Sequence, residues 1–429
     1  MPRLLLLLPT TTYRAEAYLD AARRLQLDVT IGGEQEFASA SQTTGKFLPL
    51  NFDHPHRAAQ TVAAFVRRFP IDAVIGVDDL TVVVAAAIAE KLALPHNSVA
   101  SVNAARNKFR MRELLSTQGV PVPRYQVFPV DGDPMDFARQ VTYPCVVKPL
   151  SLSASCGVIR ADDEREFAAA FRRVAALLTT LGMTAENDAR WILAEDFVGG
   201  PEVALEGLLT NGVLQPLAIF DKPDPLDGPF FEETIYVTPS RLPFDLQQRI
   251  VDCAGRAARA LGLQEGPMHG EFRANEKGVW VIELAARTIG GRCSRTLQFA
   301  AGMALEDLIL RHALRMPLPP LTREHEAAGV MMLPIPYGGV LHEVRGQNEA
   351  RAVPGIEELT ITALPGQTLV PLPEGTRYLG FLLARGRTPA DVESSLRQAH
   401  RRLTVVVTTS PSVLPDAPSP PSEIRSMSF

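Results

Sequence analysis

The first hundred residues alternate between short apolar runs and amphipathic stretches. Residues 4–8 are five consecutive leucines, which predict a strand buried on both faces of a parallel sheet, since a half-buried strand would alternate with polar residues. Helical patterns over 14–25, 61–69 and 80–92 then alternate with strand patterns over 29–31 and 73–77. Such alternation is typical of βαβ units, so residues 1–104 are predicted to form a Rossmann-like domain.

The pattern changes after residue 104. Apolar strand runs dominate residues 105–320, which predict an α+β domain. The strands are expected over 145–147, 158–159, 191–194, 203–209 and 279–284, and the helices over 107–115, 164–178 and 246–261. Residues 321–407 contain Pro-Gly turns and a closing helical pattern over 389–401, so a small α+β domain is expected there. Residues 408–429 are rich in Ser and Pro and are predicted to be a disordered tail.

Composition narrows the class of protein. The 429 residues carry 43 Lys+Arg and 48 Asp+Glu, a net charge of −5, and 46% of them are apolar. A mildly acidic chain is a poor candidate for nucleic-acid binding, and the leucine run is too short for a signal peptide or membrane span. The four cysteines are isolated, which favours a reducing cytoplasm over a disulfide framework or a zinc site. Only six of the 43 cations are lysines, so each lysine is a candidate for a specific role.

The segment 269–283 is the most informative for chemistry. Two alternating halves flank a polar turn, which predicts a β-hairpin. With a loop over 274–278, Glu271 lies opposite Val281, and Glu283 lies opposite His269 and diagonal to Glu271. The two carboxylates then share a face and suit Mg²⁺ held together with a substrate phosphate. A loop shorter by one residue would put the glutamates on opposite faces, and a solvated surface hairpin is the alternative.

The continuation of this hairpin, residues 285–292, resembles the closing motif of the ATP-grasp superfamily. In that family two acidic residues hold Mg²⁺ and a following arginine stabilises phosphoryl and tetrahedral charge, and Glu271, Glu283 and Arg287 match by type and spacing. Four further motifs occur in the family's order, at residues 106–112, 143–149, 151–157 and 195–203. The resemblance covers about residues 1–320.

The resemblance implies roles for these motifs in binding ATP. Lys108 and Lys148 match the two lysines that reach ATP phosphates, and the small-residue loop with Ser153, Ser155 and Gly157 matches the loop that closes over them. The hinge motif implies that the backbone near Val198 and the side chain of Glu195 meet adenine, and that Glu202 meets the ribose. ATP and Mg²⁺ are therefore the expected cofactors, with Mn²⁺ as an alternative metal.

Residues 329–336, 354–356 and 378–381 resemble the C-terminal domain of the L-amino acid ligases. One departure is Ala285, which stands where many family members have a metal-binding asparagine, so a second Mg²⁺ is expected to be held less fully or through water. The implied activity is an ATP-dependent carboxylate–amine ligase that forms an acyl phosphate, releases ADP and phosphate, and joins amino acids into an amide or dipeptide.

Several other residues have two interpretations. Arg292 and Arg295 could clamp a substrate carboxylate or be cations at a helix end, and His269 and Glu232 are further candidates for substrate contact. The alternative for His269 is a residue packed within the hairpin, and the alternative for Glu232 is a side chain that faces water. The pair at 78–79 could bind a ligand at the sheet's carboxyl end, but an N-cap for the next helix is favoured. Lys222 is either a phosphate or substrate contact or a solvated loop lysine.

The expected partners are a small carboxylate and an amine, without nucleic acid or membrane, and a homodimer is left open. Two other hypotheses about function remain, one for a different enzyme of the superfamily and one for a protein without catalytic activity. One is a ligase or carboxylase of small-metabolite or purine metabolism, although no biotin-carrier motif is present. The other is a non-catalytic ATP-binding module, which Ala285 leaves open.

Overall fold

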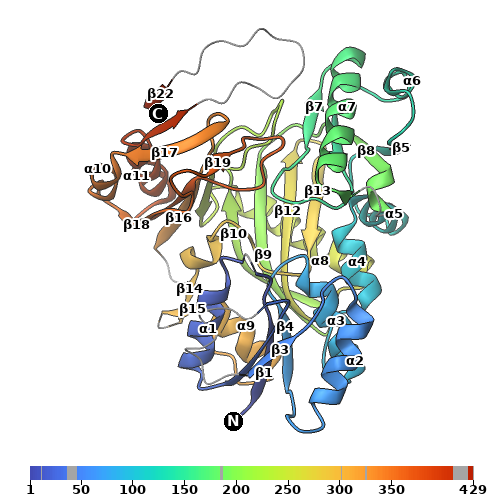
Figure 1. The fold of residues 1–429 in the computed structure, drawn as a ribbon, viewed down its shortest axis with the longest axis vertical. Helices are drawn as coiled ribbons and strands as arrows, with labels where there is room; N and C mark the ends of the chain where they lie inside the picture. Colours follow the sequence, from blue (N-terminus) through green and yellow to red (C-terminus); the bar gives the residue numbers. More distant parts are fainter. Residues whose placement is uncertain are drawn as a thin grey trace.

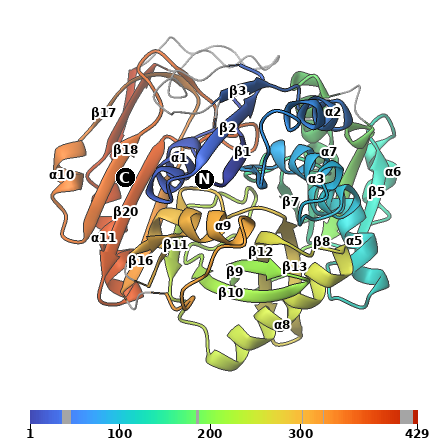
Figure 2. The same ribbon diagram turned by 90° about the horizontal axis from the view of Figure 1, so that it is seen from below.

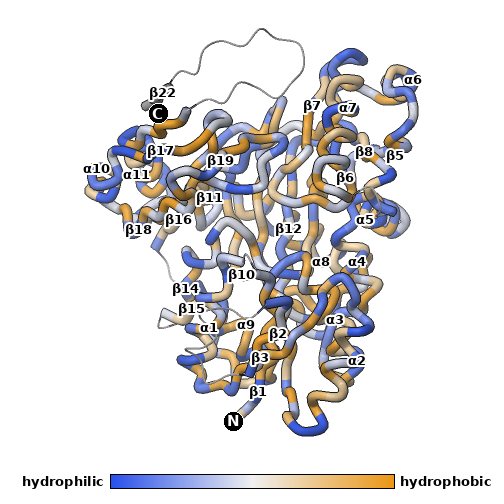
Figure 3. Tube along the Cα trace, viewed as in Figure 1, coloured by the Kyte–Doolittle hydropathy of each residue, from blue (hydrophilic) through white to orange (hydrophobic). Residues whose placement is uncertain are grey.

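The computed structural model describes residues 1–10, 12–35, 46–183, 187–300, 302–323, 326–408 and 424–428. The N-terminal module lies at the bottom of Figure 1, a small sheet at the upper right, and the C-terminal module at the upper left. A large sheet lies between them. Apolar residues follow the strands, and polar residues gather at outlying elements such as α10 (Gln347–Arg351) (Figure 3). Among the described helices, none has the length and apolar character that crossing a membrane requires.

The N-terminal module is the parallel sheet that the sequence predicts. Its order is β3-β2-β1-β4, with β1 at Arg3–Leu7, β2 at Asp28–Gly33, β3 at Lys46–Pro49 and β4 at Ala73–Gly76. Leu4 and Leu6 pack in one core with α1 (Ala15–Arg24), whereas Leu5 and Leu7 pack in another with α2 (Pro55–Phe65) and α3 (Thr81–Lys91). Figure 2 shows α1 on one side of this sheet and α2 and α3 on the other. Burial on both faces explains why the first strand has no polar alternation.

The helix expected over 61–69 is shifted toward the N-terminus and overlaps the prediction only at residues 61–65. It begins at Pro55 and ends at Phe65, because proline is favoured in the first turn of a helix. The other predicted helices and strands of this module lie within a few residues of their expected bounds.

The second module is a small antiparallel sheet covered by one long helix. Its strand order is β5-β8-β6-β7, with β5 at Tyr125–Pro129, β6 at Cys145–Pro149, β7 at Ile159–Ala161 and β8 at Trp191–Asp196. The covering helix α7 (Glu164–Thr180) contributes Phe167 and Phe171 to an apolar core that includes Phe128. Two helices, α4 (Val99–Arg106) and α5 (Lys108–Thr117), lead into this module from the parallel sheet.

The largest sheet has eight strands in the order β13-β12-β9-β10-β11-β16-β20-β18. Five of them belong to the region 105–320: β9 (Glu202–Thr210), β10 (Val213–Asp221), β11 (Ile235–Thr238), β12 (Gly266–Asn275) and β13 (Gly278–Ala285). The other three follow residue 320: β16 (Ala327–Leu333), β18 (Ile356–Ile361) and β20 (Gly380–Gly386). Because β11 pairs with β16, the proposed boundary between residues 320 and 321 crosses one continuous sheet.

Two helices pack beside this sheet. The longer, α8 (Phe244–Leu261), shares an apolar core with β9, β12 and β13, and the shorter, α9 (Leu305–Ala313), packs against α1 of the N-terminal module. Arg24 of α1 forms an ion pair with Asp307 at 2.8 Å, which ties the two modules together.

The C-terminal module adds a sheet of order β19-β17-β21-β22 and the helix α11 (Pro389–His400). The strands are β17 (Gly339–Arg345), β19 (Thr368–Leu369), β21 (Thr404–Thr408) and β22 (Ile424–Ser428). Most of the predicted tail, 409–423 and 429, lies outside the described residues. Within that tail, the prediction of disorder is wrong for Ile424–Ser428, because these residues pair with β21.

Candidate active site

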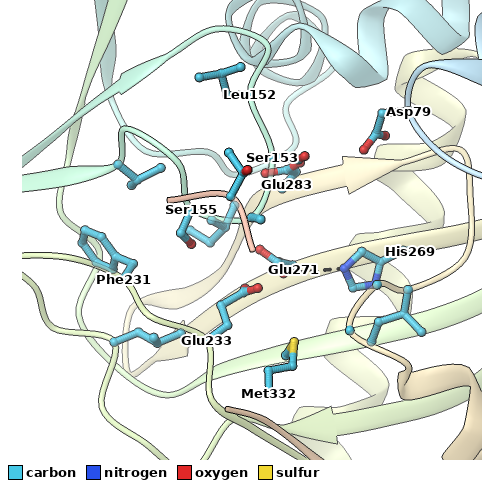
Figure 4. Close-up of a pocket in the computed structure, with 18 of the residues that line it drawn as sticks. Asp79, Leu152, Ser153, Ser155, Phe231, Glu233, His269, Glu271, Glu283 and Met332 are labelled. Atoms are coloured by element: carbon cyan, nitrogen blue, oxygen red, sulfur yellow. Dashed lines mark ion pairs between the residues drawn. The ribbon is translucent and has the colours of Figure 1, made fainter. Parts of the chain in front are cut away.

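A cavity of about 670 Å³ lies where the three modules meet, and Figure 4 shows part of its lining. Most of the residues predicted from the sequence line it: Lys108, Lys148, Ser153, Ser155, Glu195, Val198, Glu202, His269, Glu271, Glu283 and Arg287. Four of the predicted residues, Gly157, Glu232, Arg292 and Arg295, do not line it. The cavity therefore brings together predicted residues that lie up to 179 positions apart in the chain, from Lys108 to Arg287.

The acidic pair sits on adjacent strands, as predicted, but in a different register. Glu271 on β12 lies directly opposite Glu283 on β13, and His269 lies opposite Ala285. The turn is tighter than expected, with Asn275 paired to Gly278. In a regular ladder this would set Glu271 opposite Ile282 and turn Glu283 to the other face, but a β-bulge between residues 271 and 272 restores the pairing.

These two carboxylates fit a hard divalent cation. Directly paired residues on neighbouring strands have Cβ atoms about 4.5–5.5 Å apart, close enough for both side chains to reach one ion. Burial acts to raise the pKa of Glu271, but Lys222 and His269 outweigh it and hold that pKa well below its usual range. Glu271 is therefore ionised and able to act as a ligand. Ala285 is buried and offers no ligand atom at the position where the family often has asparagine.

Lys108 begins α5 at the edge of the cavity. Its ammonium donates to the carbonyl of Leu152 at 2.6 Å and lies 3.5 Å from the Glu283 carboxylate. Asn107 caps the same helix by accepting from the Arg110 N–H, which fixes the direction in which Lys108 leaves the backbone. Lys108 thus bridges the acidic pair and the loop that follows β6.

That loop, residues 151–157, carries backbone conformations suited to anion binding. Ala154 and Ser155 both have φ of 55°, and Ser153 and Ser155 line the cavity (Figure 4). Backbone N–H groups and small hydroxyl side chains in a tight turn can bind an anion, which favours phosphate here. Gly157 does not share this position, because its N–H donates to the carbonyl of Pro373 at 2.8 Å.

Lys148 belongs to a buried triad with Arg112 and Glu195. The Glu195 carboxylate accepts from Arg112 Nε at 2.7 Å and lies 2.5 Å from Lys148 Nζ. Burial lowers the pKa of Lys148 and Glu195 opposes that effect. In Glu195 the effect of burial is outweighed by Arg112 and Lys148, so its pKa is lowered. Since its carboxylate is occupied by these two cations, the Glu195 side chain holds Lys148 in place at the wall of the cavity.

A second cluster surrounds Lys222 beside the acidic pair. The Lys222 ammonium contacts carboxylate oxygens of Glu202 at 2.8 Å, Glu233 at 2.5 Å and Glu271 at 2.9 Å. Burial and the nearby charge of Glu271 raise the pKa of Glu233 to about 8. Glu202 also accepts from Arg273 Nε at 2.7 Å, so the cluster contains three carboxylates and two cations.

Asp78 and Asp79 have separate roles. Asp78 accepts from the N–H groups of Leu80 and Thr81 at the start of α3, which is the capping role that the sequence favours. Asp79 instead pairs with Arg287 at 2.8 Å across 208 residues. Burial would raise the pKa of Asp79, but Arg287 outweighs it and lowers that pKa.

His269 lies in the wall of the cavity and is buried. Its Nε2 is 3.5 Å from Glu271 (Figure 4), and its Nδ1 is 3.9 Å from the buried carboxyl of Glu206. Burial lowers the pKa of His269, so the ring is neutral near pH 7. Glu206 in turn accepts from the N–H of Ile289, on the segment that follows Arg287.

Three predicted substrate contacts lie elsewhere. Arg292 and Arg295 both pair with Glu358 of β18, at 2.8 and 3.1 Å, so they join the site loop to the C-terminal module. Glu232 lines a small adjoining pocket that shares Arg377 and Tyr378 with the cavity, and its neighbour Glu233 faces the cavity itself. The two glutamates differ because successive side chains of an extended segment point in opposite directions.

Several lining residues were missed by the sequence interpretation. Tyr13 and Arg14 enter from the N-terminal module, and Met332, Arg377, Tyr378 and Phe381 enter from the C-terminal module. Close to the hinge, Val146, Leu226 and Phe231 form an apolar patch with Phe197. Sequence periodicity gave no signal for these positions, because their proximity depends on how the modules pack.

Comparisons with known proteins agree with this arrangement. Residues 141–296 match a model of the ATP-grasp domain, residues 19–96 an ATP-grasp N-terminal domain, and residues 331–408 the L-amino acid ligase C-terminal domain 2. An L-amino acid ligase from Bacillus licheniformis superposes with a TM-score of 0.79 at 26% identity, covering 95% of this chain and 99% of that one.

Two curated relatives show similar levels of identity. The uncharacterized protein y4rH of Sinorhizobium fredii is 26% identical over 93% of this chain and 82% of its own length. The alanine–anticapsin ligase of Bacillus subtilis is 27% identical over 60% of this chain, and the match spans 58% of that ligase.

Proposed function

We propose that this chain, which belongs to the ATP-grasp superfamily of carboxylate–amine ligases, condenses two amino acids into a dipeptide at the expense of ATP. The observation that carries the proposal is the convergence of Glu271 and Glu283 with Lys108, Lys148 and Arg287 on one cavity. Phosphoryl transfer to a carboxylate requires this set: acidic ligands for Mg²⁺, cations for the phosphates, and a cation where the acyl oxygen becomes charged.

The cavity offers distinct places for the parts of ATP. The apolar patch of Val146, Leu226 and Phe231 suits the base, beside the hinge backbone at Val198. Glu202 is linked to Glu271 through Lys222 and to the Leu226 carbonyl through Arg273, so it lies between this patch and the acidic pair, where a ribose hydroxyl would reach it. Lys148, Lys108 and the loop with Ser153 and Ser155 suit the phosphates, whose charge they offset.

Glu271 and Glu283 would hold Mg²⁺. When bound, that ion supplies charge neutralisation for the phosphoryl group in transfer. Lys222 keeps Glu271 ionised and in position, and the ion pair of Lys108 with Glu283 joins the acidic pair to the phosphate loop.

The reaction proceeds in two balanced steps. A carboxylate oxygen of the first amino acid attacks the γ-phosphorus, and the bond between that phosphorus and ADP breaks. The neutral amine of the second amino acid then attacks the acyl carbon and a C–N bond forms, while phosphate leaves with one oxygen of the original carboxylate and takes up the proton that the amine nitrogen loses. Arg287 stabilises the oxyanion at this carbon, and Asp79 orients the guanidinium through its bond to Nε.

The test is a screen of L-amino acid pairs for release of ADP and phosphate. A ligase requires release that depends on both amino acids, and carboxylate labelled with oxygen-18 must pass one labelled oxygen to phosphate. Glu283→Gln is expected to lower turnover by at least about 100-fold, whereas Glu276→Gln, an exposed glutamate in the same hairpin, should leave it unchanged. Binding of ATP without turnover across the screen would instead indicate a non-catalytic module.

A further inference from the structure

The cations that line the cavity differ in what they already bind. Lys108, Lys148, Lys222, Arg273 and Arg287 each contact a carboxylate of this chain. Arg14 donates to the carbonyl and hydroxyl of Thr288 and so is held against the site loop. Arg377 lines the cavity from the C-terminal module, and it forms no hydrogen bond or ion pair with any residue that the structure describes.

The loop that carries Arg377 is held in place, although the guanidinium has no partner among the described residues. Pro373 accepts from the N–H of Gly157 at 2.8 Å, and Glu374 pairs with Arg173 of α7 through bonds of 2.5 and 2.9 Å. Tyr378, the next residue, also lines the cavity. The loop is thereby anchored to the module that bears the phosphate loop, and Arg377 stands at the rim between them.

The proposed reaction leaves one negative charge that the other cations do not meet. The attacking carboxylate becomes a neutral acyl group, and the phosphates face Lys108, Lys148 and the serine loop. The amino acid that supplies the amine keeps its own α-carboxylate from binding through to the dipeptide product. An arginine fork is suited to such a group, because it can donate two parallel hydrogen bonds to a carboxylate.

We propose that Arg377 binds the α-carboxylate of the amino acid that supplies the amine. This inference rests on the proposed function, and it makes the C-terminal module responsible for selecting a nucleophile with a free carboxylate. It predicts that the enzyme prefers an amino acid over the corresponding amino acid amide, in which the carboxylate is replaced by a neutral group and the side chain is unchanged.

The experiment compares L-amino acids with their primary amides as the amine substrate, at saturating ATP and carboxylate substrate. In Arg377→Gln the kcat/KM for the amino acid should fall about 10- to 100-fold through KM, whereas the value for the amide should stay within about twofold. Arg377→Lys keeps the charge without the fork, so it should retain part of the preference. Arg387→Gln removes another exposed arginine of the same module, away from the cavity, and should change neither value.

Each result decides a separate question. Equal losses for the acid and the amide, with a raised KM for ATP, would assign Arg377 to phosphate and overturn the inference. An unchanged preference in Arg377→Gln would also overturn it, while the ligase activity of the unmodified enzyme would still stand. Absence of ADP release by the unmodified enzyme with every pair would refute the proposed function itself, and this inference with it. Arg377 is exposed and pairs with no residue in the described part of the chain, so thermal denaturation of Arg377→Gln should match that of the unmodified protein.

Discussion

Replacing Glu195 with glutamine tests whether the buried triad beneath the cavity depends on one negative charge. Glu195 is 4% exposed and accepts hydrogen bonds from Arg112 at 2.7 and 3.3 Å, in addition to its contact with Lys148 at 2.5 Å. Glutamine keeps the size of the side chain, but its amide carries no charge and must turn a donor toward one of the two cations. The substitution therefore leaves two positive charges buried without a carboxylate between them.

The expected cost is about 3 kcal/mol at pH 7. Removing one partner of a buried ion pair costs roughly 3–5 kcal/mol, and the lower value applies because the amide oxygen still accepts one bond. Lys148 can also reduce the cost by losing its proton, since burial already lowers its pKa. In the variant the pKa of Lys148 is lower in the folded state than in the unfolded state. At a pH between these two pKa values the unfolded state therefore binds more protons than the folded state. Stability of the variant should therefore rise with pH until the unfolded pKa near 10 is reached.

Urea unfolding followed by tryptophan fluorescence measures this effect. The protein has two tryptophans. Trp191 lies on β8, the strand that carries Glu195. Trp280 lies on β13, where the carbonyl of Ile282 accepts a hydrogen bond from Arg112. Asp196→Asn is the control, because this neighbouring carboxylate pairs at 2.6 Å with Arg124, whose side chain is 75% exposed. It should cost less than about 1 kcal/mol. If Glu195→Gln proved no more costly than Asp196→Asn, the triad would not depend on that charge and our account of Lys148 would be wrong.

Three further predictions concern backbone, charge and thiols. Gly200 has φ of +110°, and an added Cβ would lie 2.2 Å from the Ala274 carbonyl oxygen. In urea unfolding, Gly200→Ala should therefore lower the free energy of unfolding by at least about 2 kcal/mol, and it should also raise the KM for ATP. Gly199→Ala meets nothing within 4 Å and should do neither. Lys222→Met should lower the free energy of unfolding by about 3 kcal/mol at pH 8. The loss should be smaller at pH 5.5, because the carboxyl groups that have lost their cation bind protons at the lower pH. Equal losses at both pH values would contradict this. Burial raises the pKa of the thiol to about 12 in Cys145 and to about 11 in Cys156 and Cys253, so native protein should react slowly with a disulfide reagent at pH 8 and quickly once unfolded.

Much of the fold follows from local pattern. The leucines of β1 predict burial on both faces, and the structure divides them between two cores as alternation along a strand requires. What periodicity could not show is that β11 pairs with β16. The hydrogen bonds of a sheet edge are satisfied by whichever strand packs there, and neither strand's residues encode that partner.

The site was partly readable because its lysines are scarce and fall within motifs. Arg112 belongs to the same motif as Lys108, yet its role depends on Glu195, 83 positions further along the chain. The choice between Glu232 and Glu233 had a usable signal. Phe231 and Glu233 are two residues apart in an extended segment and so share a side, and the apolar Phe231 marks the inward one.

The acidic pair shows how two residues can lie side by side as predicted although the geometry behind the prediction is wrong. A loop over 274–278 would have placed Glu271 and Glu283 diagonally on one face without any irregularity. The real turn is shorter, and in a regular ladder it would have separated the two carboxylates onto opposite faces of the sheet. The bulge between residues 271 and 272 restores the shared face and brings the two into direct opposition, closer than the diagonal pairing allows. Bulges are common beside active sites because they re-aim a side chain, and here the hairpin needs one in order to bring both glutamates within reach of one ion.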